Sequence, residues 1–559
     1  MADETNNTQE TWNIFLYLAG DSNLSEQLLT ALQALSTVAK HPNINIAAHL
    51  NFPSRVRPGL RLALDGSSPI TSPNLVSQQD PTNEKDEISR VSKLKAGWRN
   101  GKRTLSHARR GNVHPLDSLP DFIKWAKDKY PNGKDILILA GHGPIVAEHS
   151  FLWEDNPRGY VSLASLSEIL SAQFGNGSEN EKNGSKNKKL AVLLFDSCMA
   201  GCVEVAYEMR KCAEYMITSQ GLVPSAGRPF YKYQQALGKL IDDKTATPIA
   251  VAQEMCKVSF AHHTDFILSG RSFDIACCDL AEEKVESLAN WLSAGVPKGK
   301  PGLVAALRQG LTDPTTKEIV TDMLVAAHWK SQSYWKELYT DLYDFCEILG
   351  QKCEQQVNIC TGSTEGKTVG NITAIKEACA GIMEAINKIV LPETDYIGPD
   401  YQYSHGLSIF FPWSDPSHVI DDDAGHGDKF PPFWRDYGEI ALNSDKNTKM
   451  ASWIMFLRDM YLTGTEREVR GRKDDELATH YNDLPKAEKA NIRNRLESME
   501  NKGGGSSGKG GGSSSDDDCE CPSIKNYARR KPTKDLSDYD ELYRRYRWQP
   551  SKNFINAIK

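Results

Sequence analysis

A cysteine that directly follows a run of apolar residues is the most reactive candidate in this sequence. Residues 191–201 read AVLLFDSCMAG, so an apolar run leads into Asp196, Ser197 and Cys198. Continuous apolar runs of this length are typical of a parallel strand that is covered by helices on both faces. Ligands of open α/β sheets bind beyond the carboxyl ends of the strands. The pattern therefore places Cys198 where such proteins carry out chemistry.

His142 is the residue that could activate this thiol. It follows a second apolar run, residues 135–141, which read DILILAG. If the two runs form neighbouring parallel strands, His142 and Cys198 meet at one edge of the sheet. A thiol attacks only as the thiolate, and a Cys–His pair is the smallest unit that supplies nucleophile and base. On these residues alone, a buried strand-end thiol beside an unrelated loop histidine remains an open alternative.

Two further residues could complete such a site. The backbone N–H groups of Gly143 and Cys198 could form an oxyanion hole, because a glycine lets a substrate carbonyl approach closely. Period-two alternation puts Asp196 on the same side of its strand as Cys198. A buried carboxylate there opposes formation of a thiolate unless a cation compensates, and a substrate Arg or Lys supplies one. The alternative for Asp196 is a structural carboxylate that caps the next helix.

The elements expected to position these residues alternate between strand and helix, which predicts an α/β sheet flanked by helices. A strand over 12–20 is followed by a helix over 25–39, with Asp21 to Asn23 as its expected cap. Another helix is expected from about Ala200 to Lys211, with its N-terminal dipole near the Cys198 sulfur. Further strands are expected over 43–50, 135–141, 191–196 and 215–220.

The second half of the chain has a different character. Helical spacing dominates from 251 to 389, and an apolar run near 406–412 (GLSIFFP) predicts a strand that returns to a sheet. The helices are expected near 248–261, 281–294, 301–310, 317–328, 333–349 and 370–389. The predicted organisation is a catalytic core over 1–250, a mainly helical part over 251–462, a charged helical extension over 463–502, a Gly/Ser linker over 503–518 and a basic, aromatic tail over 519–559.

Composition narrows the class of protein. The 559 residues carry a net charge of −7, which gives no sign of a nucleic-acid-binding or membrane-surface role. No apolar run is long enough to suggest a transmembrane helix, and the N-terminus does not resemble a signal peptide. The 12 cysteines show no zinc-like spacing and favour reduced, buried thiols. A cytoplasmic protein is expected.

Six stretches together resemble the clostripain-like cysteine peptidases of the caspase-like clan. They read WNIFLYLAGDSNL, LPDFIKWAKDKYP, ILILAGHG, VLLFDSCMAG, YTDLYDFCEIL and GLSIFFP, and they span about 11–462. The resemblance implies a caspase-like α/β fold with His142 and Cys198 as the catalytic dyad. It implies Asp196 as the floor of a pocket for Arg or Lys. It also implies a zymogen that is cut between the dyad residues and, in some members, dependence on calcium.

The segment between the dyad residues contains candidate processing sites. Residues 175–189 read GNGSENEKNGSKNKK, a composition typical of an exposed, flexible loop. A protease specific for Arg or Lys, either this chain or an upstream enzyme, could cut it at four positions. These positions are Lys182, Lys186, Lys188 and Lys189.

Several expectations go beyond the catalytic residues. No metal ligands can be assigned, although Glu154, Asp155 and Asn156 could offer oxygen atoms to calcium. Residues 219–230 read SQGLVPSAGRPF where family members often carry acidic residues, so a second acidic wall of the specificity pocket is not expected. The tail could bind a regulatory partner, as in a bacterial defence cascade built around a protease. The alternative function is a caspase-like scaffold or pseudo-protease that acts through partner binding.

Overall fold

The computed structural model describes most of the two halves that the sequence predicts. The described residues are 10–51, 60–64, 114–143, 150–155, 158–175, 188–224, 229–263, 272–293, 299–334, 338–360, 366–412, 437, 440, 442 and 451–457. The charged extension, the linker and the basic tail lie outside them, as do Lys182 and Lys186. The partner predicted for the tail therefore stays a prediction.

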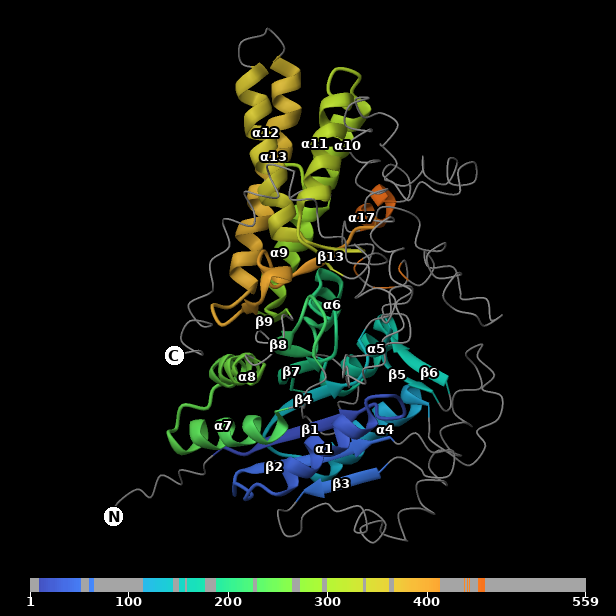
Figure 1. Ribbon diagram of the computed structural model, residues 1–559, viewed down its shortest axis with the longest axis vertical. Coiled ribbons are helices and arrows are strands. Elements are labelled where there is room, and N and C mark those ends of the chain that lie inside the picture. Colours follow the sequence, from blue (N-terminus) through green and yellow to red (C-terminus); the bar gives the residue numbers. More distant parts are fainter. Residues whose placement is uncertain are drawn as a thin grey trace, which may run out of the picture.

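An eight-stranded sheet forms the centre of the molecule, in the order β12-β9-β8-β7-β4-β1-β2-β3 (Figure 1). Its five central strands are parallel, and β3, β9 and β12 pair antiparallel with their neighbours. This confirms the predicted α/β class with a mostly parallel sheet. The strands are β1 Trp12–Leu18, β2 Ile44–Leu50, β3 Leu60–Leu64, β4 Lys134–Ala140, β7 Leu190–Asp196, β8 Ala213–Thr218, β9 Phe273–Asp279 and β12 Asp395–Ile397.

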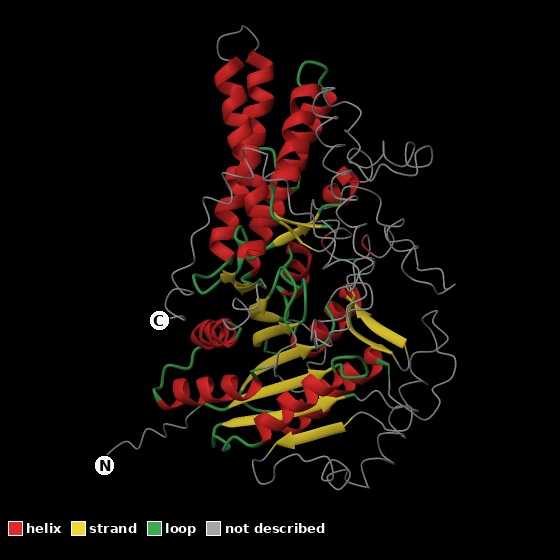
Figure 2. Ribbon diagram, viewed as in Figure 1, coloured by secondary structure: helices red, strands yellow, loops and turns green. Residues whose placement is uncertain are grey.

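Helices cover both faces of the sheet (Figure 2), which explains why its central strands are continuously apolar. On one face Ile14 of β1 belongs to the same core cluster as Leu28 of α1. On the other face Phe15 belongs to a cluster with Phe122 of α4. The first face carries α1 Ser25–Ser36, α7 Phe230–Asp242 and α8 Pro248–His262. The second carries α4 Pro115–Lys129, α5 Leu163–Phe174 and α6 Val203–Met209.

The second half of the chain is mainly helical, as predicted. Two long helices, α12 and α13, pack against each other and extend away from the sheet beside α10 and α11 (Figure 1). The helices are α9 Glu282–Leu292, α10 Leu303–Thr312, α11 Lys317–Lys330, α12 Leu342–Cys360, α13 Gly366–Ile389, the 3₁₀ helix η3 Pro399–Tyr401 and α17 Ala451–Phe456. Small sheets are formed by β5 Ser150–Asp155 with β6 Arg158–Ser162, and by β10 Ser333–Tyr334, β11 Tyr339–Asp341 and β13 Ser408–Phe410.

The structure differs from the predicted elements where strands are short. The helix predicted over 333–349 begins only at Leu342, because Tyr339–Asp341 pairs with β13. The strand β13 lies within the predicted 406–412 run. It joins the three-stranded sheet and not the main sheet. The main sheet instead receives β9 and β12, which the helical interpretation missed. The division predicted at residue 250 therefore passes through the sheet.

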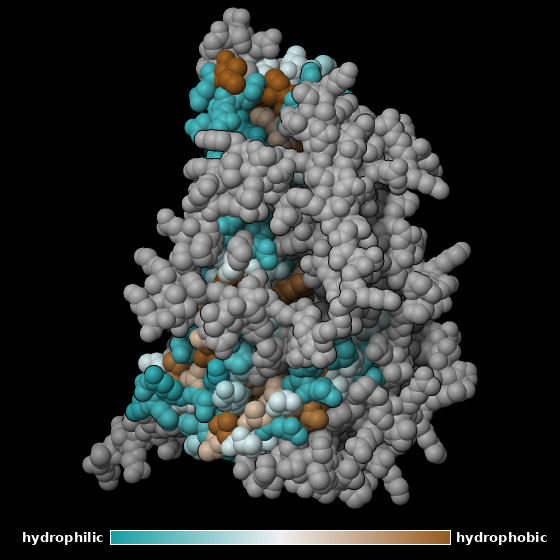
Figure 3. Space-filling model, in the orientation of Figure 1, coloured by the Kyte–Doolittle hydropathy of each residue, from teal (hydrophilic) through white to brown (hydrophobic). Residues whose placement is uncertain are grey.

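The described surface has few apolar features. On the face in Figure 3 it is largely hydrophilic with scattered hydrophobic residues. Among the described residues the exposed large apolar side chains are Ile249, Ile359 and Met455, which lie on three different helices. No helix in the described part of the chain is both long and apolar enough to cross a membrane. The cytoplasmic location stays a prediction.

Candidate active site

The carboxyl edge of the parallel sheet collects the residues that the sequence singled out. Strands β1, β4, β7 and β8 are parallel neighbours or next neighbours, so their last residues lie along one edge. Asn23 follows β1, His142 follows β4, Cys198 follows β7 and Val223 follows β8. The parallel order β4-β7 therefore brings the two predicted dyad residues to adjacent strand ends.

Gly143 packs directly against the backbone of Cys198. A Cβ atom built on Gly143 would overlap the carbonyl oxygen of Cys198 and would lie 2.7 Å from its backbone nitrogen and carbonyl carbon. Only glycine permits this approach, since no L-residue places Cβ so close to backbone atoms. The backbone of His142 is held in turn by Leu152, whose N–H donates to its carbonyl at 3.0 Å. The backbones of the histidine segment and the cysteine segment are thus in contact.

The Cys198 thiol accepts a hydrogen bond that the sequence did not reveal. The backbone N–H of Val223 donates to Sγ at 3.3 Å. This N–H favours negative charge on the sulfur. The Val223 carbonyl oxygen, 4.0 Å from Sγ, can accept from the thiol and favours the neutral form. Cys198 and His142 are each only 1% exposed, and Val223 is 5% exposed. A substrate carbonyl can therefore reach the sulfur only after the residues that cover it have moved.

The connection after Cys198 is strained and tied down. Met199 has a φ of 54°, in the left-handed region that non-glycine residues rarely adopt. Its N–H donates to Gly221, and the N–H of Gly201 donates to Ser219. The helix α6 begins at Val203 and not near Ala200 as predicted. Because a helix dipole acts mainly within its first turn, it contributes less at the sulfur than the sequence suggested.

A buried carboxylate shapes the segment that covers the thiol. Asp274 of β9 accepts hydrogen bonds from the Ser219 hydroxyl at 2.9 Å and from the backbone N–H groups of Gln220 at 2.8 Å and Gly221 at 2.9 Å. Burial raises the pKa of the Asp274 carboxyl to about 6, although these donors oppose the shift. Asp274 therefore holds residues 219–221 in the turn that leads to Val223.

The second half of the chain forms hydrogen bonds with the segment that follows Cys198. Ser408 donates its backbone N–H to the Gly201 carbonyl at 2.8 Å, and Phe410 donates to the buried Glu204 carboxylate at 3.0 Å. The side-chain oxygen of Gln220 accepts from the backbone N–H of Gly406, and its NH₂ group donates to the Asp341 carboxylate. These contacts explain why the GLSIFFP stretch belongs with the site although it lies about two hundred residues further along the chain.

Asp196 is the last residue of β7, and Cys198 lies in the turn that follows it. Val192 and Leu194 belong to the same core cluster as Cys198, and Asp196 is the next residue of that row. Asp196 is 6% exposed. Its carbonyl accepts from Gly141, which fixes the end of β7 against the end of β4. Asp196 is therefore a buried carboxylate at the carboxyl end of β7, two residues before Cys198 in the sequence.

The described processing candidates differ in their environments. Lys188 is exposed. Lys189 is held by two contacts, since its Nζ donates to the Arg210 carbonyl at 2.7 Å and to Glu282 at 3.0 Å. Lys189 must break both contacts before its side chain can enter a protease pocket.

The described residues do not fit a metal site. Glu154 is fully buried in β5, and its Oε1 accepts from the Asn51 amide at 2.6 Å. Asn156 lies outside the described residues. Within the described ranges, no group of three or more His, Cys, Asp or Glu residues could hold a metal ion. No step of the chemistry is therefore assigned to calcium.

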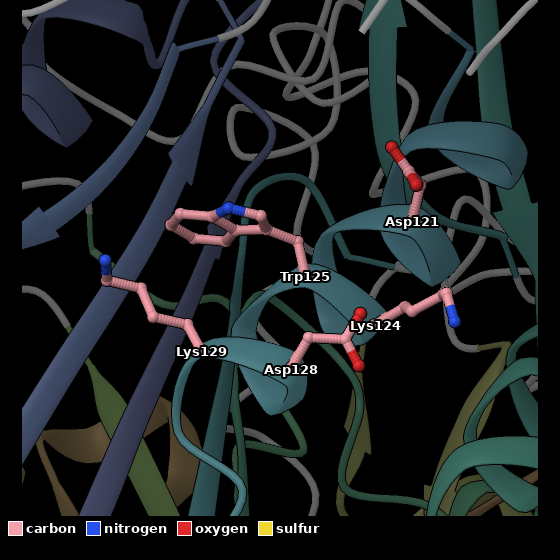
Figure 4. Close-up of a pocket in the computed structure, with 5 residues that line it drawn as sticks. All are labelled: Asp121, Lys124, Trp125, Asp128 and Lys129. Atoms are coloured by element: carbon pink, nitrogen blue, oxygen red, sulfur yellow. The ribbon is translucent and has the colours of Figure 1, made fainter. Parts of the chain in front are cut away.

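A cavity of about 390 Å³ lies on α4, away from the residues that could react (Figure 4). Its described lining side chains all come from this one helix, and none of them is a candidate catalytic residue. They are Asp121, Lys124, Trp125, Asp128 and Lys129.

One functional contact could not be found from the sequence. The side chain of Asn23, expected as a helix cap, instead places Oδ1 2.7 Å from Nε2 of His142. The helix α1 begins at Ser25, and its N-cap residue Leu24 makes no side-chain capping bond. The sequence signal for Asn23 was the same as for any polar residue before a helix, so only the strand order could reveal its partner.

Comparison with known proteins identifies the family. The sequence model of the clostripain family matches residues 58–409. Clostripain from Hathewaya histolytica is 23% identical over 454 residues, which are 74% of this chain and 76% of that protein. Among solved structures, an inactive zymogen of a C11 protease from Parabacteroides distasonis is 16% identical, with 72% of this chain and 93% of that chain covered and a TM-score of 0.39. A secreted C11 cysteine protease from Bacteroides thetaiotaomicron, in complex with an irreversible peptide inhibitor, is 14% identical, with 72% and 92% covered and a TM-score of 0.40.

A sheet edge that joins a histidine and a cysteine defines a candidate thiol hydrolase. The family match covers more than half of the sequence. The chain belongs to the clostripain family and is a cysteine peptidase, which acts on protein or peptide substrates.

Proposed function

We propose that this chain is an endopeptidase that cleaves after Arg or Lys, with Cys198 as the nucleophile and His142 as the base. The observation that carries the proposal is the contact of the segment after β4 with the segment after β7, in which Gly143 packs on the Cys198 backbone. It brings a nucleophile, a base and backbone donors to one strand edge. These are the parts that acyl transfer requires.

The reaction follows from these parts. His142 takes the proton of the Cys198 thiol, and the sulfur attacks the carbonyl carbon of the scissile peptide bond. Backbone N–H groups of Gly143 and Cys198 stabilise the oxyanion. His142 then gives its proton to the leaving amine, the C–N bond breaks and a thioester remains. Water, deprotonated by His142, attacks the thioester and releases the second product together with the free thiol.

Specificity for Arg or Lys rests on Asp196. Replacing Asp196 by Asn keeps the size of the side chain but removes its charge. We expect kcat/KM for peptides with Arg or Lys before the cleaved bond to fall about 100-fold, because a desolvated charge pair is lost. A panel of fluorogenic peptides with Arg, Lys, Gln or Leu at that position measures the effect.

The matched control is Glu214→Gln, which removes an exposed carboxylate at the opposite edge of the same sheet. This variant should keep the preference of the wild type. If Asp196→Asn also kept the wild-type preference for Arg and Lys, another group would have to select the basic side chain.

We further propose that the chain is a zymogen, since the two catalytic candidates are buried in this state. Cleavage in the 175–189 segment would then have to change the structure around Cys198, which lies at the other edge of the sheet. The segment begins and ends at the amino edge of the sheet. Lys127 at the end of α4 bonds the Gln173 carbonyl near the end of α5, and Leu190 at the start of β7 bonds the Cys212 carbonyl. Cys198 lies at the other edge.

The length of β7 limits which molecule can make this cut. Its 7 residues span about 20 Å, at about 3.3 Å for each residue. Lys186 is only two residues from Lys188, where the described chain resumes, so it can reach about 7 Å from that point. The processing lysines next to β7 therefore cannot enter the Cys198 site of their own chain. A cut at Lys186, Lys188 or Lys189 is therefore made in trans, by a second copy or by an upstream protease.

Processing in trans is tested with Cys198→Ala as the substrate. Catalytic amounts of active wild type should cut this variant within 175–189, at a rate proportional to the wild-type concentration. Mass spectrometry of the fragments should find cuts after Lys182, Lys186 or Lys188 before any cut after the anchored Lys189.

A combined replacement of Lys182, Lys186, Lys188 and Lys189 by Gln should remove these fragments. The proposal fails if wild type processes itself at a rate that dilution does not change while Cys198→Ala stays intact beside it. Unchanged fragments from the four-lysine variant would refute the assignment of the sites.

A further inference from the structure

We infer that Asn23 is a positioning residue of the site, which holds the imidazole of His142 in one orientation and one tautomer. Oδ1 of Asn23 lies 2.7 Å from Nε2 of His142, across 119 residues of sequence. This inference rests on the proposed role of His142 as the base. It adds a third strand end, that of β1, to the two that carry the dyad.

The backbone on both sides of Asn23 is fixed. The hydroxyl of Ser22 accepts from the N–H of Leu24 at 3.2 Å, and the carbonyl of Ser22 accepts from the N–H of Ser25 at 3.3 Å. Leu24 is 1% exposed and belongs to the core cluster beneath α1. A turn held in this way carries the Asn23 side chain at a defined place, which a positioning role requires.

The order of the strands explains why β1 supplies this residue. β2 lies on one side of β1 and β4 on the other, so the strand order reverses between the connections that follow β1 and β4. The two strands are in register from Trp12 to Leu18, and Ala19 donates to the Ala140 carbonyl at 2.9 Å. The residues that follow these two strands, Asn23 and His142, therefore meet across the point where the strand order reverses.

The chemistry of an amide oxygen defines the tautomer. Oδ1 of Asn23 can only accept, so the proton of neutral His142 is on Nε2. Nδ1 is then the basic nitrogen, which receives the proton of Cys198. When His142 becomes an imidazolium during acylation, the Nε2–H bond to Asn23 becomes charge-assisted and stronger. Asn23 therefore stabilises the charged state that forms on the reaction path more than the neutral one.

Two substitutions separate positioning from structure. Asn23→Leu keeps the approximate size but removes the acceptor, and we expect kcat to fall 10- to 100-fold with KM nearly unchanged. Asn23→Asp restores an acceptor and adds charge. It should recover most of kcat and move the acidic limb of the kcat/KM profile to higher pH, because a carboxylate favours the imidazolium. Asn45→Leu, at the amino edge of the sheet, is the matched control and should change neither quantity.

A second measurement does not depend on turnover. In Cys198→Ala, ¹⁵N NMR of labelled histidine should show His142 with a protonated Nε2 and an unprotonated Nδ1, the signal being assigned by its loss in His142→Ala. Asn23→Leu should convert it to a mixture of tautomers. The inference is overturned if the tautomer and the pH profile are both those of wild type in Asn23→Leu. Absence of any Cys198-dependent turnover would overturn the proposed function instead, while the NMR result would still decide the role of Asn23.

Discussion

Cys198→Ala is expected to remove peptidase activity, and His142→Ala is expected to do nearly the same. The rate should fall at least about 10⁴-fold in each, because neither the nucleophile nor the base can be replaced by water in this buried site. The measurement is kcat/KM on a fluorogenic peptide with Arg before the cleaved bond, using protein that has been processed in the 175–189 segment.

The control is another buried cysteine on the same sheet. Cys212 lies at the amino edge, and burial raises the pKa of its thiol to about 12, so it stays protonated and unreactive. Cys212→Ser should keep the kcat/KM of wild type. Turnover that survives in Cys198→Ala would refute the assignment. Absence of turnover in every processed form of wild type would favour the alternative scaffold function.

The double variant adds a sharper test of the pair. If Cys198 and His142 act as one unit, Cys198→Ala with His142→Ala should lose no more activity than Cys198→Ala alone. Effects that multiply would show that His142 acts on a separate step. Thermal unfolding of each variant, measured alongside, shows whether a loss of activity comes from a loss of structure.

The sequence predicted the strands of the site better than the rest of the fold. Long apolar runs such as those before His142 and Cys198 allow few interpretations, because only strands buried on both faces need them. The strand Phe273–Asp279 was missed since it lies among helices and contains two cysteines and two aspartates. Strands of three residues, such as β12 and β13, are too short for any periodicity to show.

The partners of the dyad were harder to predict than the dyad itself. Val223 acts through its backbone N–H, so the identity of its side chain carries no signal. Asp274 lies on a strand that the sequence did not reveal, 54 residues from the Gln220 N–H that it binds. Asn23 and His142 come together only through the order of the strands, which local patterns do not define.

The contacts of residues 219–223 also bear on the burial of Cys198. The Val223 segment is held by Asp274 from β9, and Leu222 donates to the Tyr401 hydroxyl at 3.1 Å. Residues 220–222, on the amino side of Val223, are therefore attached to elements of the second half of the chain. Asp196 at the end of β7 and Cys198 two residues further on are both buried. Under the proposed function, opening of the site has to expose both the Cys198 thiol and the Asp196 carboxylate.

Gly143→Ala is the second change for which we expect a large loss. The added Cβ would overlap the carbonyl oxygen of Cys198, which is backbone and cannot rotate away. Either the His142 segment or the Cys198 segment has to shift. A displacement of about 1 Å in a catalytic group costs about 100-fold, and a misplaced oxyanion donor costs a similar factor. We expect kcat/KM to fall about 10³-fold.

The control for Gly143→Ala is a glycine with open space around it. Gly370 is exposed within α13, and a Cβ built on it meets nothing within 4 Å. Gly370→Ala should keep full activity and raise the free energy of unfolding by about 0.5–1 kcal/mol, since alanine favours a helix more than glycine does. If Gly143→Ala kept wild-type kcat/KM, the two strand ends could not be packed as described. If it lost activity while its unfolding midpoint fell by only a few degrees, the close contact of these two backbones would be a requirement of the chemistry and not only of the fold.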